Sequence, residues 1–149
     1  MNFKQQIVKE YQLRIQDKID AFQDMILALS EDSKNDAKGS AGDKHETALS
    51  MMHIEQEKLN HKLKEYLNDR DQFSKIYFSK KHSKVQIGSL VQANSNYFLV
   101  GIALPKITID GQTIFGISPQ SPLAQELIGN EVGCTFKINT TVYTINHIE

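Results

Sequence analysis

The hydrophobic residues of this chain follow two different periods, and the period changes near residue 74. In residues 1–74 the apolar side chains recur at steps of three and four, which is the spacing of one helix face. In residues 84–149 short runs rich in Val, Ile and Thr alternate with turn residues, which is the pattern of strands. The charge divides in the same way, because residues 1–74 hold 11 basic and 14 acidic residues and residues 75–149 hold 6 and 4. We therefore expect an α+β protein built from a helical part and a sheet part.

The first half contains two narrow apolar stripes. The second stripe alternates steps of three and four from Leu49 to Phe73, a heptad spacing with polar breaks at Gln56 and Arg70. A narrow stripe is buried by one partner helix, so we expect an antiparallel coiled-coil hairpin over residues 1–74 with a tip loop at residues 30–46. The first stripe consists of Phe3, Ile7, Tyr11, Ile15, Ile19, Phe22, Ile26 and Leu29.

The second half predicts an antiparallel sheet with one short helix over residues 84–149, after a connector at residues 75–83. Asp110-Gly111 is a strong signal for a two-residue hairpin. Ser121 before Pro122 predicts the N-cap and first turn of the short helix, which Gly129 closes. The expected strands are Lys84–Ala93, Tyr97–Leu104, Lys106–Ile109, Gln112–Ile117, residues 134–138 and Val142–Ile148.

Composition excludes several classes of protein. A net charge of −1 argues against binding DNA or RNA through bulk positive charge. One cysteine excludes a disulfide framework and a zinc site built mainly from thiolates. No apolar run approaches the ~18 residues of a membrane span, and the first residues lack the apolar segment of a signal peptide. We expect a cytoplasmic protein that does not contact a membrane.

The expected tip holds two acids whose spacing has two explanations. Asp43 is followed three residues later by Glu46, which fits a capping box at the start of the second helix. The same two carboxylates could instead share a Mg²⁺ ion, which takes few protein carboxylates and completes its shell with water or phosphate. Two acids would bind the ion poorly alone but could complete a site that another macromolecule has half built. The two explanations are compatible.

No other residues form a self-contained active site. His45 and His53 lie eight residues apart with no cysteine nearby, so solvated or packing histidines are expected. Cys134 lies on the apolar face of a predicted strand and is interpreted as a small buried hydrophobe. Lys58 and Lys62 form a basic pair typical of a solvated helix face. The chain is therefore not expected to be an enzyme.

Three features resemble the GreA/GreB family of bacterial transcript-cleavage factors. The first is the order of a helical hairpin and a small sheet domain in a chain of this length. The second is the tip segment, which is similar to the family motif Gly-Asp-x-x-Glu-Asn-Ala and reads Gly42-Asp43-Lys44-His45-Glu46-Thr47-Ala48. The third is the segment Ile117–Gly129, in which a Ser-Pro-Leu-Ala step precedes a short helix and a Leu-Ile-Gly close.

The resemblance implies a specific function. Such factors bind the rim of the RNA polymerase secondary channel through an FKBP-like domain, here with Gln120, Ser121 and Pro122 on the docking surface. The hairpin enters the channel, where Asp43 and Glu46 help to hold the second catalytic Mg²⁺ while the polymerase cleaves a backtracked transcript. The protein would then have no cofactor of its own, would meet the RNA 3′ end only within the complex, and would not bind DNA independently.

Departures from the family motif leave alternatives open. Thr47 replaces the family's Asn, Leu49-Ser50 replaces its Glu-Tyr, and Gln120 stands where an acid or Asn is frequent. A factor with such a tip could bind the channel and inhibit or regulate the polymerase without cleavage. A coiled-coil adaptor with a merely structural tip and a prolyl isomerase of the FKBP type are further alternatives, the latter disfavoured by few aromatic residues.

Overall fold

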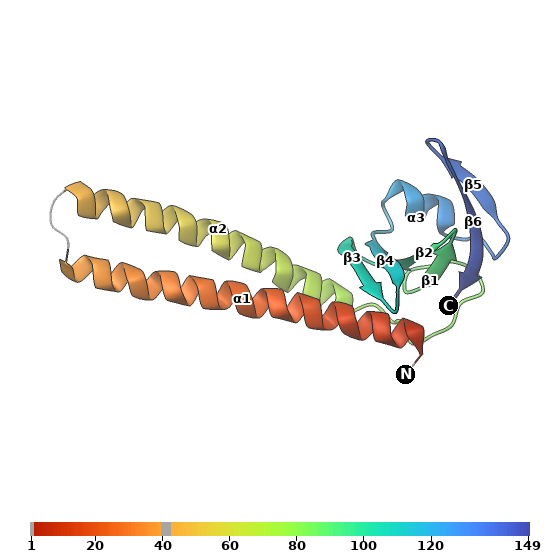
Figure 1. Cartoon of the computed structure of the whole chain (residues 1–149), viewed down its shortest axis with the longest axis horizontal. Helices are drawn as coiled ribbons and strands as arrows, with labels where there is room; N and C mark the ends of the chain where they lie inside the picture. The colour runs from red at the N-terminus through yellow and green to blue at the C-terminus, as the bar shows by residue number, and fades with distance from the viewer. Residues whose placement is uncertain (1, 40–42) are drawn as a thin grey trace. The chain divides into compact units, whose positions relative to one another are not determined.

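The computed structural model describes the backbone of residues 2–39 and 43–149, and the side chains of these residues other than 33–39 and 43–45. Two long helices precede a six-stranded mixed sheet that carries one short helix, which confirms the predicted α+β class (Figure 1). The elements are α1 (Phe3–Gly39), α2 (Asp43–Ser74), β1 (Leu90–Ala93), β2 (Asn96–Val100), β3 (Leu104–Ile109), β4 (Gln112–Ile117), α3 (Pro122–Leu127), β5 (Thr135–Ile138) and β6 (Thr141–Ile148).

The contacts divide the chain into two compact units at points other than the change in composition. The sheet unit comprises Met1–Tyr11 and Gln72–Glu149, and the hairpin unit comprises Gln12–Asp71. The first turns of α1 thus belong with the sheet, although the sequence pattern assigned them to the hairpin.

The hairpin unit contains two antiparallel helices, and residues of both predicted stripes contact each other at Phe22 and Tyr66. Ile15 and Ile19 are buried, and the rings of Phe22 and Tyr66 lie 5.4 Å apart. The polar break of the heptad at Arg70 is satisfied across the helix pair, because its Nη1 donates to Oε1 of Gln16 at 3.2 Å.

Helix α1 extends ten residues beyond the point where the sequence analysis began the tip loop. It continues to Gly39, so residues 30–39 are helical and only residues 40–42 fall between the helices. The segment from Ser30 to Lys38 contains no Gly or Pro and includes Glu, Lys and Ala, which favour helix. The polarity of this segment led to its assignment as a loop, but a polar segment can also form a helix.

The sheet has the order β3-β4-β2-β1-β6-β5, and its one parallel pair corrects the prediction of an antiparallel sheet. Strand β4 pairs parallel with β2 and antiparallel with β3, so it fills the space between them. The turn at Asp110-Gly111 forms as predicted, with φ of 51° and 76° at its two residues. Regular pairing begins only at Leu90 in the first expected strand, because residues 84–89 are irregular, with a turn at Ile87-Gly88.

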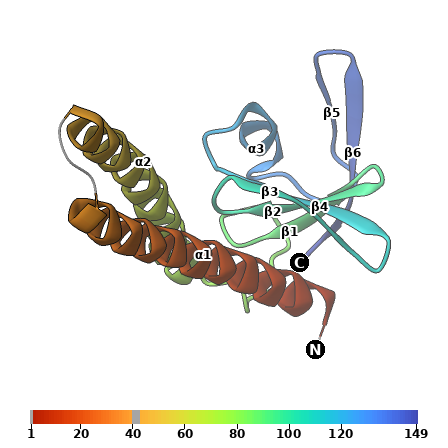
Figure 2. The ribbon, with the colours of Figure 1, turned by 60° about the vertical axis from the view of Figure 1, so that its left-hand side comes forward.

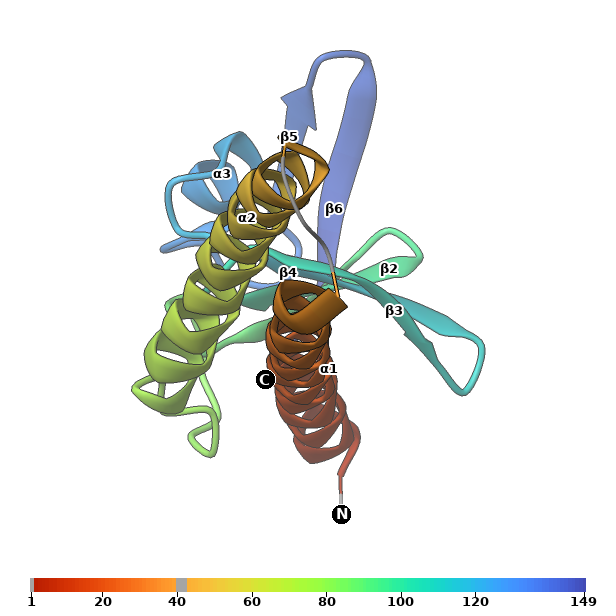
Figure 3. The ribbon, with the colours of Figure 1, turned by 90° about the vertical axis from the view of Figure 1, so that its left-hand side faces the viewer.

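The two faces of the sheet are covered by different elements of the same unit. Helix α3 packs on one face through Leu127 and the half-buried Leu123. The first turns of α1 cover the opposite face, where Phe3 meets Tyr97 with ring centroids 5.0 Å apart (Figure 2). The last residues of β6 pair with β1, and the tip of the β5–β6 hairpin extends beyond that pairing (Figure 3). The core of the α3 face consists of Val85, Val91, Ala93, Phe98, Val100, Leu127, Ile145 and Ile148.

Candidate functional site

The acidic motif begins helix α2. Asp43 is the first residue of the helix, and Glu46 lies in its first turn with its side chain exposed to solvent. The side chains of Asp43 and His45 lie outside the described residues, so the structure does not test whether Asp43 caps the helix. Residues three apart on a helix are neighbours on its surface, so this backbone allows both acids to serve one ligand.

The described residues contain no metal centre of their own. No group of three or more His, Cys, Asp and Glu side chains gathers among them in a way that could hold an ion. The two motif carboxylates are the ligand type that Mg²⁺ prefers, but they provide too few donors for a stable site without further oxygen ligands. The donor set therefore fits an ion that is shared with another molecule.

The sequence signature Gln120, Ser121 and Pro122 forms the start of helix α3. Ser121 is the N-cap, as predicted, because its Oγ accepts from the backbone N–H of Ala124 at 3.1 Å and donates to the carbonyl of Ser118 at 2.8 Å. Pro122 occupies the first helical turn, where its missing N–H costs nothing. Gln120 and Pro122 are exposed and Ser121 is half-buried, so this segment lies at the surface where a partner could contact it.

Removing the Ser121 hydroxyl should destabilise the sheet unit. Ser121→Ala leaves one N–H at the start of α3 without its partner, and we expect a loss of about 1 kcal/mol in the free energy of unfolding. Ser121→Thr keeps the hydroxyl and serves as the control. Urea denaturation measures both variants, and equal midpoints for Ser121→Ala and the wild type would show that the cap contributes nothing.

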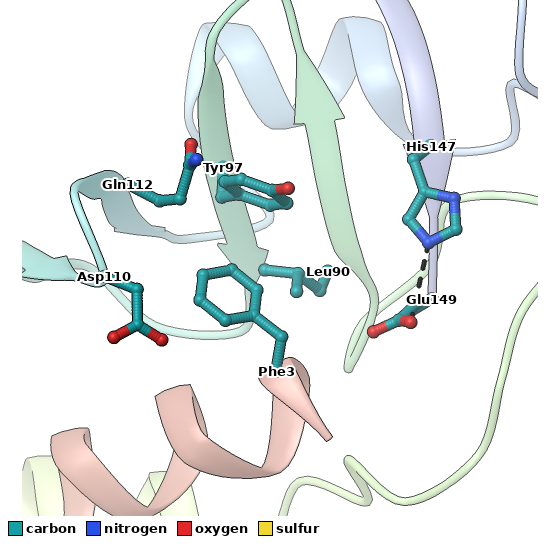
Figure 4. Close-up of a pocket in the computed structure, with 7 residues that line it drawn as sticks. All are labelled: Phe3, Leu90, Tyr97, Asp110, Gln112, His147 and Glu149. Carbon is teal, nitrogen blue, oxygen red and sulfur yellow. Dashed lines mark ion pairs between the residues drawn. The ribbon is translucent and has the colours of Figure 1, made fainter.

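A pocket of about 260 Å³ opens on the sheet unit beside the first turn of α1. Figure 4 shows the rings of Phe3 and Tyr97 at its centre, with Asp110 on one side and the His147–Glu149 pair on the other. The two atoms of that pair, Nε2 and Oε1, lie 3.5 Å apart. The sequence analysis did not identify this pocket, because its residues come from separate segments that each had a structural explanation.

Lys4 is a buried cation that the sequence analysis also missed. Only 5% of the residue is exposed, and its Nζ donates to the backbone carbonyls of Lys80 and Glu149, each at 3.1 Å. Burial lowers the pKa of its ammonium group, and the Glu149 carboxylate partly opposes this. Its burial could have been predicted, since Lys4 lies three residues before Ile7 and seven before Tyr11, on the same helix face. The ammonium therefore links α1 to the connector and to Glu149, which follows the last strand.

His82 lies near this cation and makes a side-chain hydrogen bond. Its Nδ1 is 2.7 Å from the Oγ of Ser89, a fully buried residue whose Oγ accepts from the N–H of Gln86. The Ser89 proton is thus available to a neutral imidazole. Burial, followed by the positive charges of Lys4 and Lys80, lowers the pKa of His82 below its ordinary value of 6.5.

Stability should therefore decrease in acid through His82. Because its pKa is lower in the folded state, the unfolded chain binds more protons, and the contribution is complete above pH 6.5 and lost as the pH falls through the folded pKa. His82→Asn keeps a hydrogen-bonding side chain without this titration. We expect its free energy of unfolding to fall less between pH 7 and pH 5 than that of the wild type, measured by urea denaturation. Parallel pH profiles for the two proteins would contradict the assignment.

The described helices contain no segment that is long and apolar enough to cross a membrane. No protein-family model and no curated protein matches this sequence. Among solved structures the chain is similar to "the transcription factor Gfh1", with 15% identity, a TM-score of 0.36 and coverage of 92% of each chain. A likeness at this identity and TM-score carries no argument about function. The functional case therefore depends on the residues themselves.

Proposed function

We propose that the protein is a Gre-like transcription elongation factor that binds RNA polymerase and acts through its secondary channel. The observation that carries this proposal is the position of the acidic motif, which opens the second helix of an antiparallel hairpin with Glu46 exposed. The motif matches the family's tip pattern at Gly42, Asp43, Glu46 and Ala48. A second motif at Ser121-Pro122 opens α3 on the sheet unit, as the resemblance requires.

The proposed mechanism assigns a simple task to each part of the chain. Gln120, Ser121 and Pro122 belong to the surface that docks on the polymerase, and the hairpin carries Asp43 and Glu46 to the polymerase active site. There the two carboxylates supply oxygen ligands that the chain cannot use alone. Mg²⁺, when bound in the complex, activates water and stabilises charge on the transferring phosphate. The protein itself is then not an enzyme, and its place of action is the cytoplasm.

A regulator that enters the channel without promoting cleavage is the second candidate. It is favoured by the residues after the motif, because Thr47 and Leu49-Ser50 differ from the family pattern. Both candidates require polymerase binding, and they differ in whether the carboxylates assist cleavage.

Binding to the core RNA polymerase of the same species tests the proposal. The purified full-length chain, labelled with a fluorophore, is titrated with polymerase and followed by fluorescence anisotropy. We expect saturable binding of one chain per polymerase. If the chain does not bind polymerase, both candidates fail and a coiled-coil adaptor for another protein becomes the better hypothesis.

A further inference from the structure

A long part of the sheet unit lacks acidic residues altogether. Residues 72–109 contain five lysines and no Asp or Glu. Three of these lysines are exposed and fall within five consecutive residues. They are Lys80, Lys81 and Lys84. Among the described residues Lys80 and Lys81 have no carboxylate within ion-pair distance, and Lys84 reaches only Glu131 at 3.9 Å. Positive charge is therefore concentrated in residues 80–84 and weakly neutralised.

The buried Lys4 adds to this positive surface from below. Its ammonium donates to the carbonyl oxygen of Lys80, and the nearby Glu149 offsets its charge only in part. Lys4 and Lys80 lie close enough to His82 to disfavour its protonated form. The buried ammonium of Lys4 therefore lies beside the backbone of the connector at Lys80.

Two large apolar side chains are exposed in the residues that flank these lysines in the sequence. Tyr77 is 71% exposed and Ile87 is 53% exposed. The backbone brings the two segments together, because a Cβ on Gly88 would lie only 2.7 Å from the carbonyl oxygen of Tyr77. The φ of Gly88 is +96°, a conformation that glycine adopts without strain. An aromatic and an aliphatic side chain next to a basic rim is a composition typical of protein interfaces.

We infer that Tyr77, Lys80, Lys81, Lys84 and Ile87 form a docking surface for an acidic protein segment that also presents apolar side chains. Charge complementarity selects an acidic partner, and the apolar pair selects a protein over a nucleic acid. Of the two exposed apolar side chains only Tyr77 has a ring on which a base could stack, whereas apolar side chains of a protein segment can pack against both Tyr77 and Ile87. Under the proposed function, on which this identification of the partner depends, the segment belongs to RNA polymerase.

The direct test uses a fluorescent peptide probe of alternating Glu and Leu residues, with the full-length protein. We expect binding that weakens with salt and falls at least about tenfold in Lys80→Glu/Lys81→Glu, since exposed charges are screened over ~10 Å at 0.1 M salt. The matched control is Lys106→Glu/Lys137→Glu, which makes the same charge change at two exposed lysines of the same unit. Lys4 donates to the backbone carbonyl of Lys80, so the reversal leaves that contact available.

Three results of the binding titrations would overturn the inference. These are no binding of the peptide, equal losses in the two reversal variants, and tighter binding of a single-stranded RNA of equal charge. A salt-sensitive dimer of the wild type that is lost in Lys80→Glu/Lys81→Glu would identify the acidic hairpin of a second copy as the occupant, and would also overturn it.

Polymerase titrations separate this inference from the proposed function. If Lys80→Glu/Lys81→Glu binds polymerase as well as the wild type does, the docking surface is not used there and the proposed function stands. If the wild type binds the acidic peptide but not polymerase, the surface is supported and the proposed function fails.

Discussion

The variant Asp43→Asn/Glu46→Gln is expected to lose stimulation of transcript cleavage while it still binds RNA polymerase. Asn is as good an N-cap as Asp, and Gln can replace Glu in a capping box, so these amides preserve the start of α2. They remove both negative charges, which are what a magnesium ion requires. We expect the cleavage rate of backtracked complexes to fall by roughly two orders of magnitude, the range for loss of a group that stabilises transition-state charge.

Glu55→Gln/Glu57→Gln is the matched control for this prediction. It makes the same change of charge at two exposed acids further along α2, away from the motif. We expect cleavage and polymerase affinity within about twofold of the wild type, as for surface substitutions in general. If the Asp43/Glu46 amide variant cleaves as fast as this control, the carboxylates serve only to cap the helix.

The second large effect is on stability, from Phe98→Ala in the core of the sheet unit. Phe98 is 5% exposed and lies between two other rings, with centroids 5.6 Å from Phe115 and 6.4 Å from Tyr143. Truncation removes the buried ring and leaves a cavity between α3 and the sheet. We expect a loss of about 3–5 kcal/mol in the free energy of unfolding, a large part of the stability of a small domain.

Tyr77→Ala provides the comparison for an exposed aromatic residue. Tyr77 is 71% exposed, so its removal should change the free energy of unfolding by less than about 0.5 kcal/mol. Urea denaturation monitored by circular dichroism measures both variants. Similar losses in the two would contradict the described core. A well-folded Tyr77→Ala would also show that any loss of peptide binding arises at the docking surface.

The hairpin stripes could be predicted from the sequence because a helix repeats its exposure every three or four residues. Ile15, Ile19 and Phe22 pack as their spacing required. The same spacing places Lys4 on the buried face of the helix, but the ammonium group of a lysine on an apolar face is ordinarily assumed to reach solvent. Only the folded chain shows that the carbonyls of Lys80 and Glu149, about 76 and 145 residues away, satisfy it.

The order of strands could not be predicted in the same way. Alternation identifies a strand and its faces, and Asp110-Gly111 identifies the β3–β4 hairpin. Neither signal says that β4 inserts beside β2, because that pairing depends on contacts between segments that no turn joins. The pocket beside Phe3 escaped prediction for the same reason, since its lining comes from both ends of the chain.

The acidic motif was found from its residue types and spacing, and its place at the start of α2 agrees with the prediction. The length of the tip loop could not be predicted from the sequence, because a polar segment such as Ser30–Lys38 can form either a loop or an exposed helix. Tertiary contacts decide between the two when propensity is weak. The function of the motif depends on a partner molecule, which no pattern within one chain can establish.

The most direct measurement is cleavage of the RNA in backtracked elongation complexes, assembled from core RNA polymerase with a 3′-mismatched transcript and incubated with the wild-type chain and Mg²⁺. We predict rapid release of short 3′ RNA fragments and a shortened transcript that resumes extension when nucleotides are added. A transcript that keeps its full length at saturating protein would contradict the assignment of Asp43 and Glu46 to cleavage.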